Sequence, residues 1–202
     1  MLIALFAAHL FQTAPTAADF FALTPGMIRS FVDGANLSSE EVLTLISVDG
    51  KPVLPVVERA EGKVISRGFY RVEPNAVYLL GYDDQSNWLP EPMPIIRFDG
   101  REGKWSFSGM SGTGRAAQPV NFAGECKSVR EEDVFGKRVP VLEVRMQGTM
   151  GGGASEEHYL QVAKYAIGVG MFEFRSSTQT GRHKTPPVVR RLTKVEGAKS
   201  NG

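Results

Sequence analysis

Short runs of β-branched and aromatic residues, separated by turn residues, recur along the chain from residue 19 onward. The run at 42–48 (VLTLISV) is typical, and it is followed by Asp49-Gly50, a dipeptide that favours a two-residue hairpin turn. No window sustains the i, i+3, i+4, i+7 spacing of apolar residues that an amphipathic helix requires. The sequence therefore predicts an all-β, mainly antiparallel fold with little helix.

The number of these runs predicts about nine to eleven strands in one strongly curved sheet, arranged as a half-barrel or a sandwich. Ser38 or Ser39 precedes acidic residues, as a helix N-cap does. This pattern predicts one helical turn at 38–43.

Prolines mark two further segments. Pro52 and Pro55 predict that the run at 51–58 is an edge strand, because proline lacks the N–H that a central strand donates to its neighbour. The segment 87–94 (NWLPEPMP) contains three prolines. It is predicted to be an extended connector across the edge or end of the sheet.

The chain has 202 residues, of which 42% are hydrophobic, so it can bury a core without disulfides or metals. We find no linker with a change in composition and predict a single all-β domain at 19–196. A faint internal repeat around 21–31 and 97–107 suggests two related halves meeting near 90–96. Residues 197–202 are predicted to be a flexible tail.

The first eighteen residues have the pattern of an export signal. Positions 2–11 are apolar apart from His9, and small and polar residues follow up to Ala18. This apolar run is too short to span a bilayer, which takes about 20 residues. We predict a signal peptide at 1–18, cleaved after Ala18, and no transmembrane segment beyond it. The alternative is a buried N-terminal strand or helix, because the segment before the apolar run has no Lys or Arg.

The predicted destination is the periplasm, the cell envelope or the extracellular space. A single cysteine, Cys126, fits an exported protein, because such proteins pair their cysteines or largely avoid them. Cys126 lies among alternating apolar residues and is predicted to be a buried structural thiol.

Overall charge argues against nucleic acid as a partner. The chain carries 23 Lys and Arg against 22 Asp and Glu, so it has no strong positive field. From Arg182 to the end, six Lys or Arg residues face one Glu. That segment either contacts anionic envelope surfaces or forms a solvated last strand at 188–192 with a frayed end.

The sequence gives few candidates for catalysis, and we assign no catalytic residue and no cofactor. The glycine tracts lack both the nucleophile-elbow spacing and the Gly-Lys-Ser/Thr ending of a phosphate loop, which favours hairpin loops. Glu156 and His158 lie two positions apart and so share one face of a strand. They are either two ligands of a metal site or charged, half-exposed residues beside a hairpin turn.

Two acidic residues, Asp83 and Asp84, stand beside Tyr82 and Trp88. Carboxylates next to aromatic rings are typical of a sugar site. A solvated turn explains the pair equally well.

Three segments resemble a group of uncharacterised bacterial exported β-rich proteins. They are 19–26 (DFFALTPG), 102–107 (EGKWSF) and 164–174 (KYAIGVGMFEF), which span nearly the whole predicted mature chain. Ala22 replaces the usual proline, and Ile28 or Phe31 stands where Trp is typical. The resemblance implies the fold and export, and it transfers no functional residue.

These observations predict an exported, non-enzymatic binding or structural module of the bacterial cell envelope. The aromatic residues Trp105, Phe107 and Phe172 are candidates to line a groove on the curved sheet for a hydrophobic small molecule or an envelope protein. The alternative is a secreted hydrolase with its site near His158. The sequence leaves the oligomeric state open.

Overall fold

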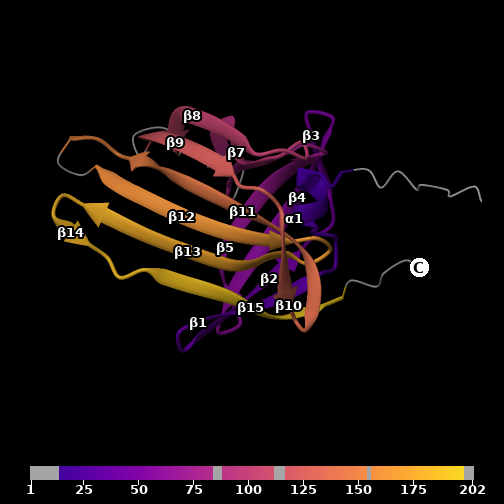
Figure 1. Ribbon diagram of the computed structural model, residues 1–202. Helices are drawn as coiled ribbons and strands as arrows, with labels where there is room; N and C mark the ends of the chain where they lie inside the picture. Colours follow the sequence, from indigo (N-terminus) through magenta and orange to yellow (C-terminus); the bar gives the residue numbers. More distant parts are fainter. Residues whose placement is uncertain (1–13, 84–87, 112–116, 154–155, 198–202) are drawn as a thin grey trace, which may run out of the picture.

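The computed structural model describes residues 14–83, 88–111, 117–153 and 156–197 (Figure 1). These residues form fifteen strands and one short helix, α1 (Ala17–Phe21). The first seven strands are β1 (Ile28–Asp33), β2 (Asn36–Val42), β3 (Ile46–Val48), β4 (Lys51–Ala60), β5 (Lys63–Glu73), β6 (Ala76–Tyr82) and β7 (Trp88–Arg97). The remaining eight are β8 (Gly103–Ser111), β9 (Gln118–Cys126), β10 (Arg130–Val134), β11 (Lys137–Met150), β12 (Glu157–Ala166), β13 (Gly170–Thr180), β14 (His183–Lys184) and β15 (Val188–Glu196).

The strands form one antiparallel sheet that begins and ends in the middle of the sequence. Its order is β7-β6-β5-β4-β2-β1-β15-β13-β12-β11-β9-β8, with the short strands β3, β10 and β14 paired at its margins. The first and last long strands pair with each other, from Ile28 opposite Glu196 to Asp33 opposite Arg190. Every other neighbour on this path is joined by a connection within one half of the chain.

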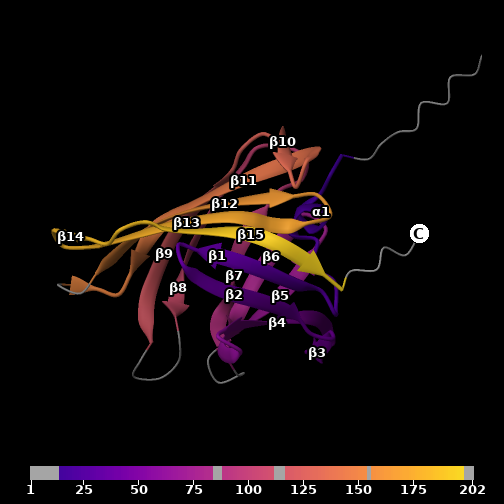
Figure 2. The ribbon, with the colours of Figure 1, turned by 90° about the horizontal axis from the view of Figure 1, so that it is seen from below.

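The sheet curls until its two outer strands, β7 and β8, face each other (Figure 2). No backbone ladder joins these two strands within the described ranges. Instead, the indole Nε1–H of Trp105 on β8 donates to the carbonyl oxygen of Pro94 on β7, at 3.0 Å. The result is a nearly closed barrel with a seam between β7 and β8.

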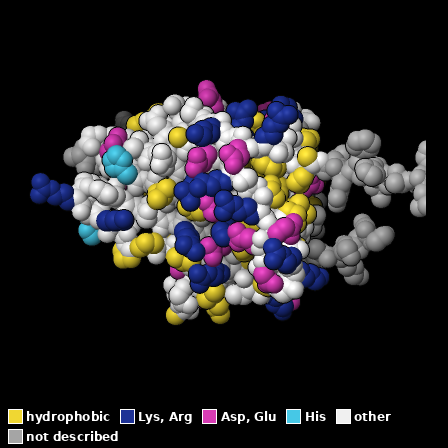
Figure 3. Space-filling view, viewed as in Figure 1, with side chains coloured by type: hydrophobic (Ala, Val, Ile, Leu, Met, Phe, Trp, Pro, Cys, Tyr) yellow, Lys and Arg dark blue, Asp and Glu magenta, His cyan; other side chains and the backbone are white. Residues whose placement is uncertain are grey.

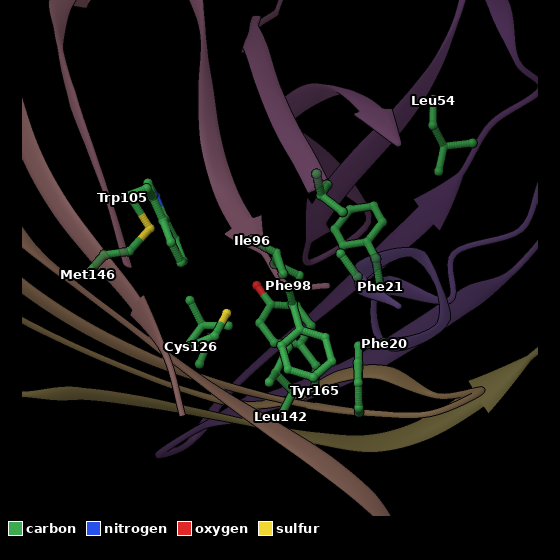
Figure 4. Packing of buried hydrophobic residues seen from close by; sticks show 14 of the residues in the cluster. Phe20, Phe21, Leu54, Ile96, Phe98, Trp105, Cys126, Leu142, Met146 and Tyr165 are labelled. Atoms are coloured by element: carbon green, nitrogen blue, oxygen red, sulfur yellow. The ribbon is translucent and has the colours of Figure 1, made fainter. Parts of the chain in front are cut away.

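Helix α1 packs against one end of this barrel and supplies part of its core (Figure 1). Phe20 is fully buried and meets Phe98 edge to face, with ring centroids 5.5 Å apart. Figure 4 shows Phe20 and Phe98 packed beside Leu142 of β11 and Tyr165 of β12. The Asp19 carboxylate accepts from the N–H and the hydroxyl of Thr16, at 2.7 and 2.8 Å, which holds the first turn of α1.

The predicted class is confirmed: the chain is all-β, antiparallel and strongly curved, with little helix. The strand number is higher than the nine to eleven expected, partly because β3, β10 and β14 are too short to recognise as separate runs. The hairpin turn at Asp49-Gly50 is also confirmed, since both residues have the positive φ angles, 50° and 72°, that such a turn needs.

The predicted helical turn at 38–43 is wrong, because 36–42 is strand β2, paired on both sides. The edge assignment of 51–58 is also wrong, since β4 lies between β5 and the strands β2 and β3. Pro55 lies where β4 passes from β3 to β2, so no ladder donor is lost on that side. The proline-rich segment after residue 87 is a strand at the sheet edge, β7, rather than a connector.

The predicted export signal lies largely outside the described residues, which begin at Ala14, and its cleavage stays a prediction. The predicted boundary after Ala18 falls inside α1, whose Ala17 is completely buried. Among the described residues, no helix is long and apolar enough to cross a membrane. The predicted tail at 197–202 is described only at Gly197.

Candidate functional site

The curled sheet encloses a chamber of about 310 Å³ between its two walls. One wall is formed by β11, β12 and β13, and the other by β2, β4, β5 and β6, with β15 and β7 at the sides. The chamber borders the core that α1 packs against, because Val56, Val144, Met146, Ala163 and Tyr165 belong both to that core and to the chamber lining. The lining residues alternate along β4, β5, β11 and β12, because every second side chain of a strand faces inward, whereas on β13 the register shift opposite Lys164 and Tyr165 separates Met171 and Phe174 by three positions. The residues are Glu40, Val56, Glu58, Ser66, Gly68, Tyr70, Tyr82, Ile95, Val144, Met146, Gln161, Ala163, Tyr165, Met171, Phe174 and Arg190.

The wall formed by β11, β12 and β13 is mostly apolar. Val144 and Met146 on β11 lie next to Ala163 on β12, which in turn is opposite Phe174 on β13. Gln161 interrupts this surface at one point. Val144, Met146 and Ala163 are at most 8% exposed, and the partly buried Met171 and Phe174 add to the apolar surface that faces the chamber.

The opposite side of the chamber carries a network of four charged residues. Arg190 on β15 reaches Glu40 Oε1 at 3.1 Å with Nη1 and Glu58 Oε1 at 3.0 Å with Nη2. Glu40 also forms an ion pair with Arg29, and the side chains of both are almost fully buried. Two positive and two negative groups meet here, so the network is electrically balanced.

The ring of Phe31 packs against both arginines of this network. The guanidinium carbon of Arg190 lies 4.0 Å from the centroid of the Phe31 ring, and that of Arg29 lies 5.4 Å from the same centroid. Such stacking favours a partly dehydrated guanidinium group. Phe31 therefore fixes both arginines while their charged ends pair with Glu40.

Burial changes the protonation of the groups around the chamber. It raises the pKa of the Glu58 carboxyl, and neighbouring Glu40 raises it further, while Arg190 opposes both effects. Burial also raises the pKa of Tyr70, Tyr82 and Tyr165. The three phenols therefore stay neutral and keep their O–H groups as hydrogen-bond donors.

Tyr82 marks an open part of the chamber. Its relative exposure is 47%, although protein surrounds it closely enough for burial to dominate the shift of its pKa. Tyr82 is one of the residues that line the hollow. Its neighbours there include Glu58 and Ser66, which place polar atoms around the phenol.

The three aromatic residues that the sequence suggested for ligand binding do not come together. Trp105 is in the core, where its indole closes the seam between β7 and β8. Phe107 is also in the core, on the inner face of β8. Phe172 packs on the other face of the sheet against Val134 and Ala166.

Glu156 and His158 lie on the outer face of the sheet, away from the chamber. Glu156 Oε1 is 3.5 Å from His158 Nε2, and His158 is 60% exposed. This separation and exposure fit a solvated pair. Within the described ranges, no group of three or more His, Cys, Asp or Glu side chains could hold a metal ion.

The structure separates Tyr82 from Trp88. Tyr82 faces the chamber, whereas Trp88 packs against Phe69 with ring centroids 5.1 Å apart, in a small cluster on the other face. Asp83 follows β6 in a left-handed conformation, and Asp84 lies outside the described residues. The two aromatic rings therefore do not form one surface.

Sequence reasoning missed the charged network. A signal for part of it exists in β2, where Ser38, Glu40 and Val42 alternate toward the interior, so that Glu40 shares a face with a buried valine. Arg190 was counted only as part of a basic C-terminal segment. Its place inside the barrel depends on the pairing of β15 with β1, which local sequence does not reveal.

Cys126 is buried, as predicted. Burial raises the pKa of its thiol to about 12, and a hydrogen bond with the backbone of Arg97 acts in the opposite direction. The thiol therefore stays protonated at neutral pH, where it is a poor nucleophile.

Two solved structures resemble this chain at low sequence identity. One is a protein from Bacteroides fragilis NCTC 9343 described as exported and as having a YmcC-like fold, with a TM-score of 0.46 and 9% identity over 88% of this chain and 98% of that one. The other is a protein from Parabacteroides distasonis ATCC 8503 described as a lipoprotein, with a TM-score of 0.45 and 8% identity over the same shares. No protein-family model matches this chain, and no curated protein does. Similarity at this level carries no function to this chain.

Proposed function

We propose that this protein is an exported, non-enzymatic binding module that holds a small amphipathic molecule in the chamber of its curled sheet. The observation that carries the proposal is the pairing of an apolar wall with a buried polar one inside a single hollow. Val144, Met146 and Phe174 would contact the apolar part of the ligand. Tyr82, Ser66 and the charged network would face its polar end.

The volume and the charge of the chamber limit which ligands can bind in it. A volume of about 310 Å³ is at the lower end of the range for small-molecule sites. Each buried CH₂ group of a ligand contributes about 0.8 kcal/mol, so a single hydrocarbon chain on the apolar wall would supply most of the affinity. Because the charges of Arg29, Glu40, Glu58 and Arg190 balance, the polar end favours a head group that donates and accepts hydrogen bonds without net charge.

The seam between β7 and β8 offers a way in. Ile95 on β7 lines the chamber, and separating the two strands would break the hydrogen bond from Trp105 to Pro94 but no backbone ladder. Every other boundary along the main path of the sheet is hydrogen-bonded. We therefore place ligand entry at this seam.

Export is proposed from the sequence. The apolar segment at 2–11 and the small residues up to Ala18 support passage out of the cytoplasm. A periplasmic or envelope location would place the chamber where amphipathic molecules are abundant. Reading the mature N-terminus of the protein purified from its own envelope fraction tests this part, and a retained Met1 would contradict it.

The chamber is tested with two tryptophan substitutions one residue apart. Ser66→Trp places a large ring in the chamber, whereas Ile65, its neighbour on β5, is 57% exposed and does not line the chamber. The probe is N-phenylnaphthylamine, whose fluorescence rises in apolar surroundings. We expect Ser66→Trp to weaken probe binding at least about tenfold, equivalent to about 1.4 kcal/mol, and Ile65→Trp to leave it unchanged.

Native mass spectrometry of the protein from its envelope fraction supplies a second measurement. A bound molecule that is lost under denaturing conditions, and that Ser66→Trp excludes, is the expected result. Equal probe binding by both variants, with circular dichroism showing that both are folded, would overturn the proposal.

A further inference from the structure

A second and larger hollow, of about 700 Å³, lies on the outer face of the sheet. It crosses six neighbouring strands, β8, β9, β11, β12, β13 and β14. Most of its lining residues point to the opposite face of the sheet from those that line the chamber. Between them lie inward-pointing positions, of which only the backbone borders the hollow: Phe107, Phe122, Gly148, Tyr159 and Thr178. The proposed function does not use this hollow.

The strand register arranges the outward side chains of this hollow in two rows that cross the sheet. We call the first the polar row: Ser108, Asn121, Thr149, His158, Gln179 and Lys184. The second, the mixed row, is Ser106, Ala123, Gln147, Leu160 and Ser177. Neighbouring strands lie about 4.8 Å apart, so each row presents a side chain at about that interval, and the polar row extends for roughly 24 Å.

The chemistry of these rows differs from the rest of the same face. Farther along the strands, outward positions carry ion pairs, such as Lys164 with Glu132 at 2.8 Å and Arg145 with Glu143 at 2.8 Å. Figure 3 shows this charged area in the middle of the face and, around the histidine at its left, an area with fewer charged side chains. Glu156 lies at the margin of that area, 3.5 Å from His158. The two rows contain only one Lys and no Asp, Glu or Arg. Both areas of this face are exposed to water, so exposure alone does not explain why one of them carries so few charged side chains.

The side chains are suited to a neutral, hydroxyl-rich ligand. Ser, Thr, Asn and Gln both donate and accept hydrogen bonds, as sugar hydroxyls do. Leu160 is 48% exposed, lies between Gln147 and Ser177 in the mixed row, and offers an apolar contact for the C–H face of a sugar ring. A protein partner fits less well, because none of the outward side chains in the two rows is Phe, Tyr or Trp, whereas the central part of a protein interface is usually rich in these residues.

We propose that this outer hollow binds a linear, uncharged oligosaccharide that lies across the strands along the two rows. The regular interval of the rows suits a chain of repeating units, and the absence of acidic and arginine side chains disfavours a strongly charged polymer. This site is separate from the chamber. A protein with both would hold a glycan on the outside of the sheet and a small amphiphile within it.

The test uses three probes, cellohexaose, maltohexaose and chitohexaose, added at millimolar concentration to the isotopically labelled full chain. We expect at least one to give saturable changes in the NMR spectrum, confined to residues of the two rows. The double variant Asn121→Ala/Gln147→Ala removes one hydrogen-bonding side chain from each row. Losing about two hydrogen bonds should weaken binding at least about tenfold.

Two controls separate this site from the chamber. Gln161→Ala removes an amide from the inner face of β12 and should leave glycan affinity unchanged. Ser66→Trp, which fills the chamber, should also leave it unchanged, so the two proposals can fail independently.

Three results would overturn the inference. The first is no saturable change with any of the three probes on the folded protein. The second is an equal loss of affinity for the double variant and for Gln161→Ala. The third is stronger binding of oligogalacturonate than of the neutral probes that disappears with added salt, because this would show a charge-driven surface.

Discussion

Glu40 and Glu41 are neighbours on β2 that face opposite sides of the sheet. Glu40 pairs with Arg29 and Arg190 in the buried network. Glu41 pairs with Arg59 at 3.2 Å, where both side chains are more than one-third exposed. The same residue type and the same loss of charge can therefore be compared in two environments one position apart.

We expect Glu40→Ala to lower the free energy of unfolding by about 3–5 kcal/mol, because it leaves two buried guanidinium groups without their shared partner. Glu41→Ala should cost less than about 1 kcal/mol, because water screens an exposed pair. Urea denaturation of the two variants measures the difference. Equal losses would show that the network is not buried in solution.

Glu58 predicts a dependence of stability on pH. Its pKa is raised in the folded protein, chiefly by burial, so folding favours its protonated form. Its contribution to stability is therefore fully present below the unfolded pKa and is lost as the pH rises through the folded pKa. We expect the unfolding free energy of the wild type, minus that of Glu58→Gln, to fall as the pH rises from ~4 to ~8. A rise would mean that the attraction of Arg190 outweighs burial.

At the scale of elements, the pairing of β8 with β9 holds the seam in place. Trp105 lies opposite Gly124, and a Cβ added to Gly124 would lie 2.2 Å from Cε2 of the indole. The glycine therefore leaves the space that the ring occupies. With the ring in that position, its N–H reaches the carbonyl oxygen of Pro94 on β7.

We expect Gly124→Ala to displace the indole and to lower the unfolding free energy by at least ~2 kcal/mol. Amide hydrogen exchange should become faster along β7 and β8 in particular, because the contact between them is lost. Gly152→Ala is the control, since a Cβ there would meet no atom within 4 Å. Similar effects of the two substitutions would contradict this role for Gly124.

At the scale of the whole molecule, β15 joins the two halves of the sheet. It pairs with β1 on one side and with β13 on the other, and it supplies Arg190 to the network. The pairing of β15 with β1 connects residues more than 150 positions apart, such as Ile28 and Glu196. The continuity of the sheet between its two halves therefore depends on β15.

We expect a chain ended after Pro187 to lose its near-ultraviolet circular dichroism and its cooperative unfolding. A separate peptide of residues 188–197 should restore both, because it can take the place of β15 between β1 and β13. If the shortened chain kept a native spectrum without the peptide, β15 would not be needed to close the barrel.

The sequence alone predicted the fold class because its signals are local. Alternation of apolar and polar residues specifies strands, and dipeptides such as Asp49-Gly50 specify the turns between them. The burial of Cys126 was predictable for the same reason, since its neighbours alternate in β9. At Ser38 the local signal was misleading, because pairing with β1 and β4 outweighed the resemblance to a helix cap.

Only the tertiary structure decided where the two sheet edges meet, which strand joins the halves and which charges are buried. Arg29, Glu40, Glu58 and Arg190 come from four strands, and no spacing in the sequence connects them. The two outer rows likewise depend on the register of six strands. Register and closure arise from pairing between distant segments, whereas sequence patterns report only what each segment does by itself.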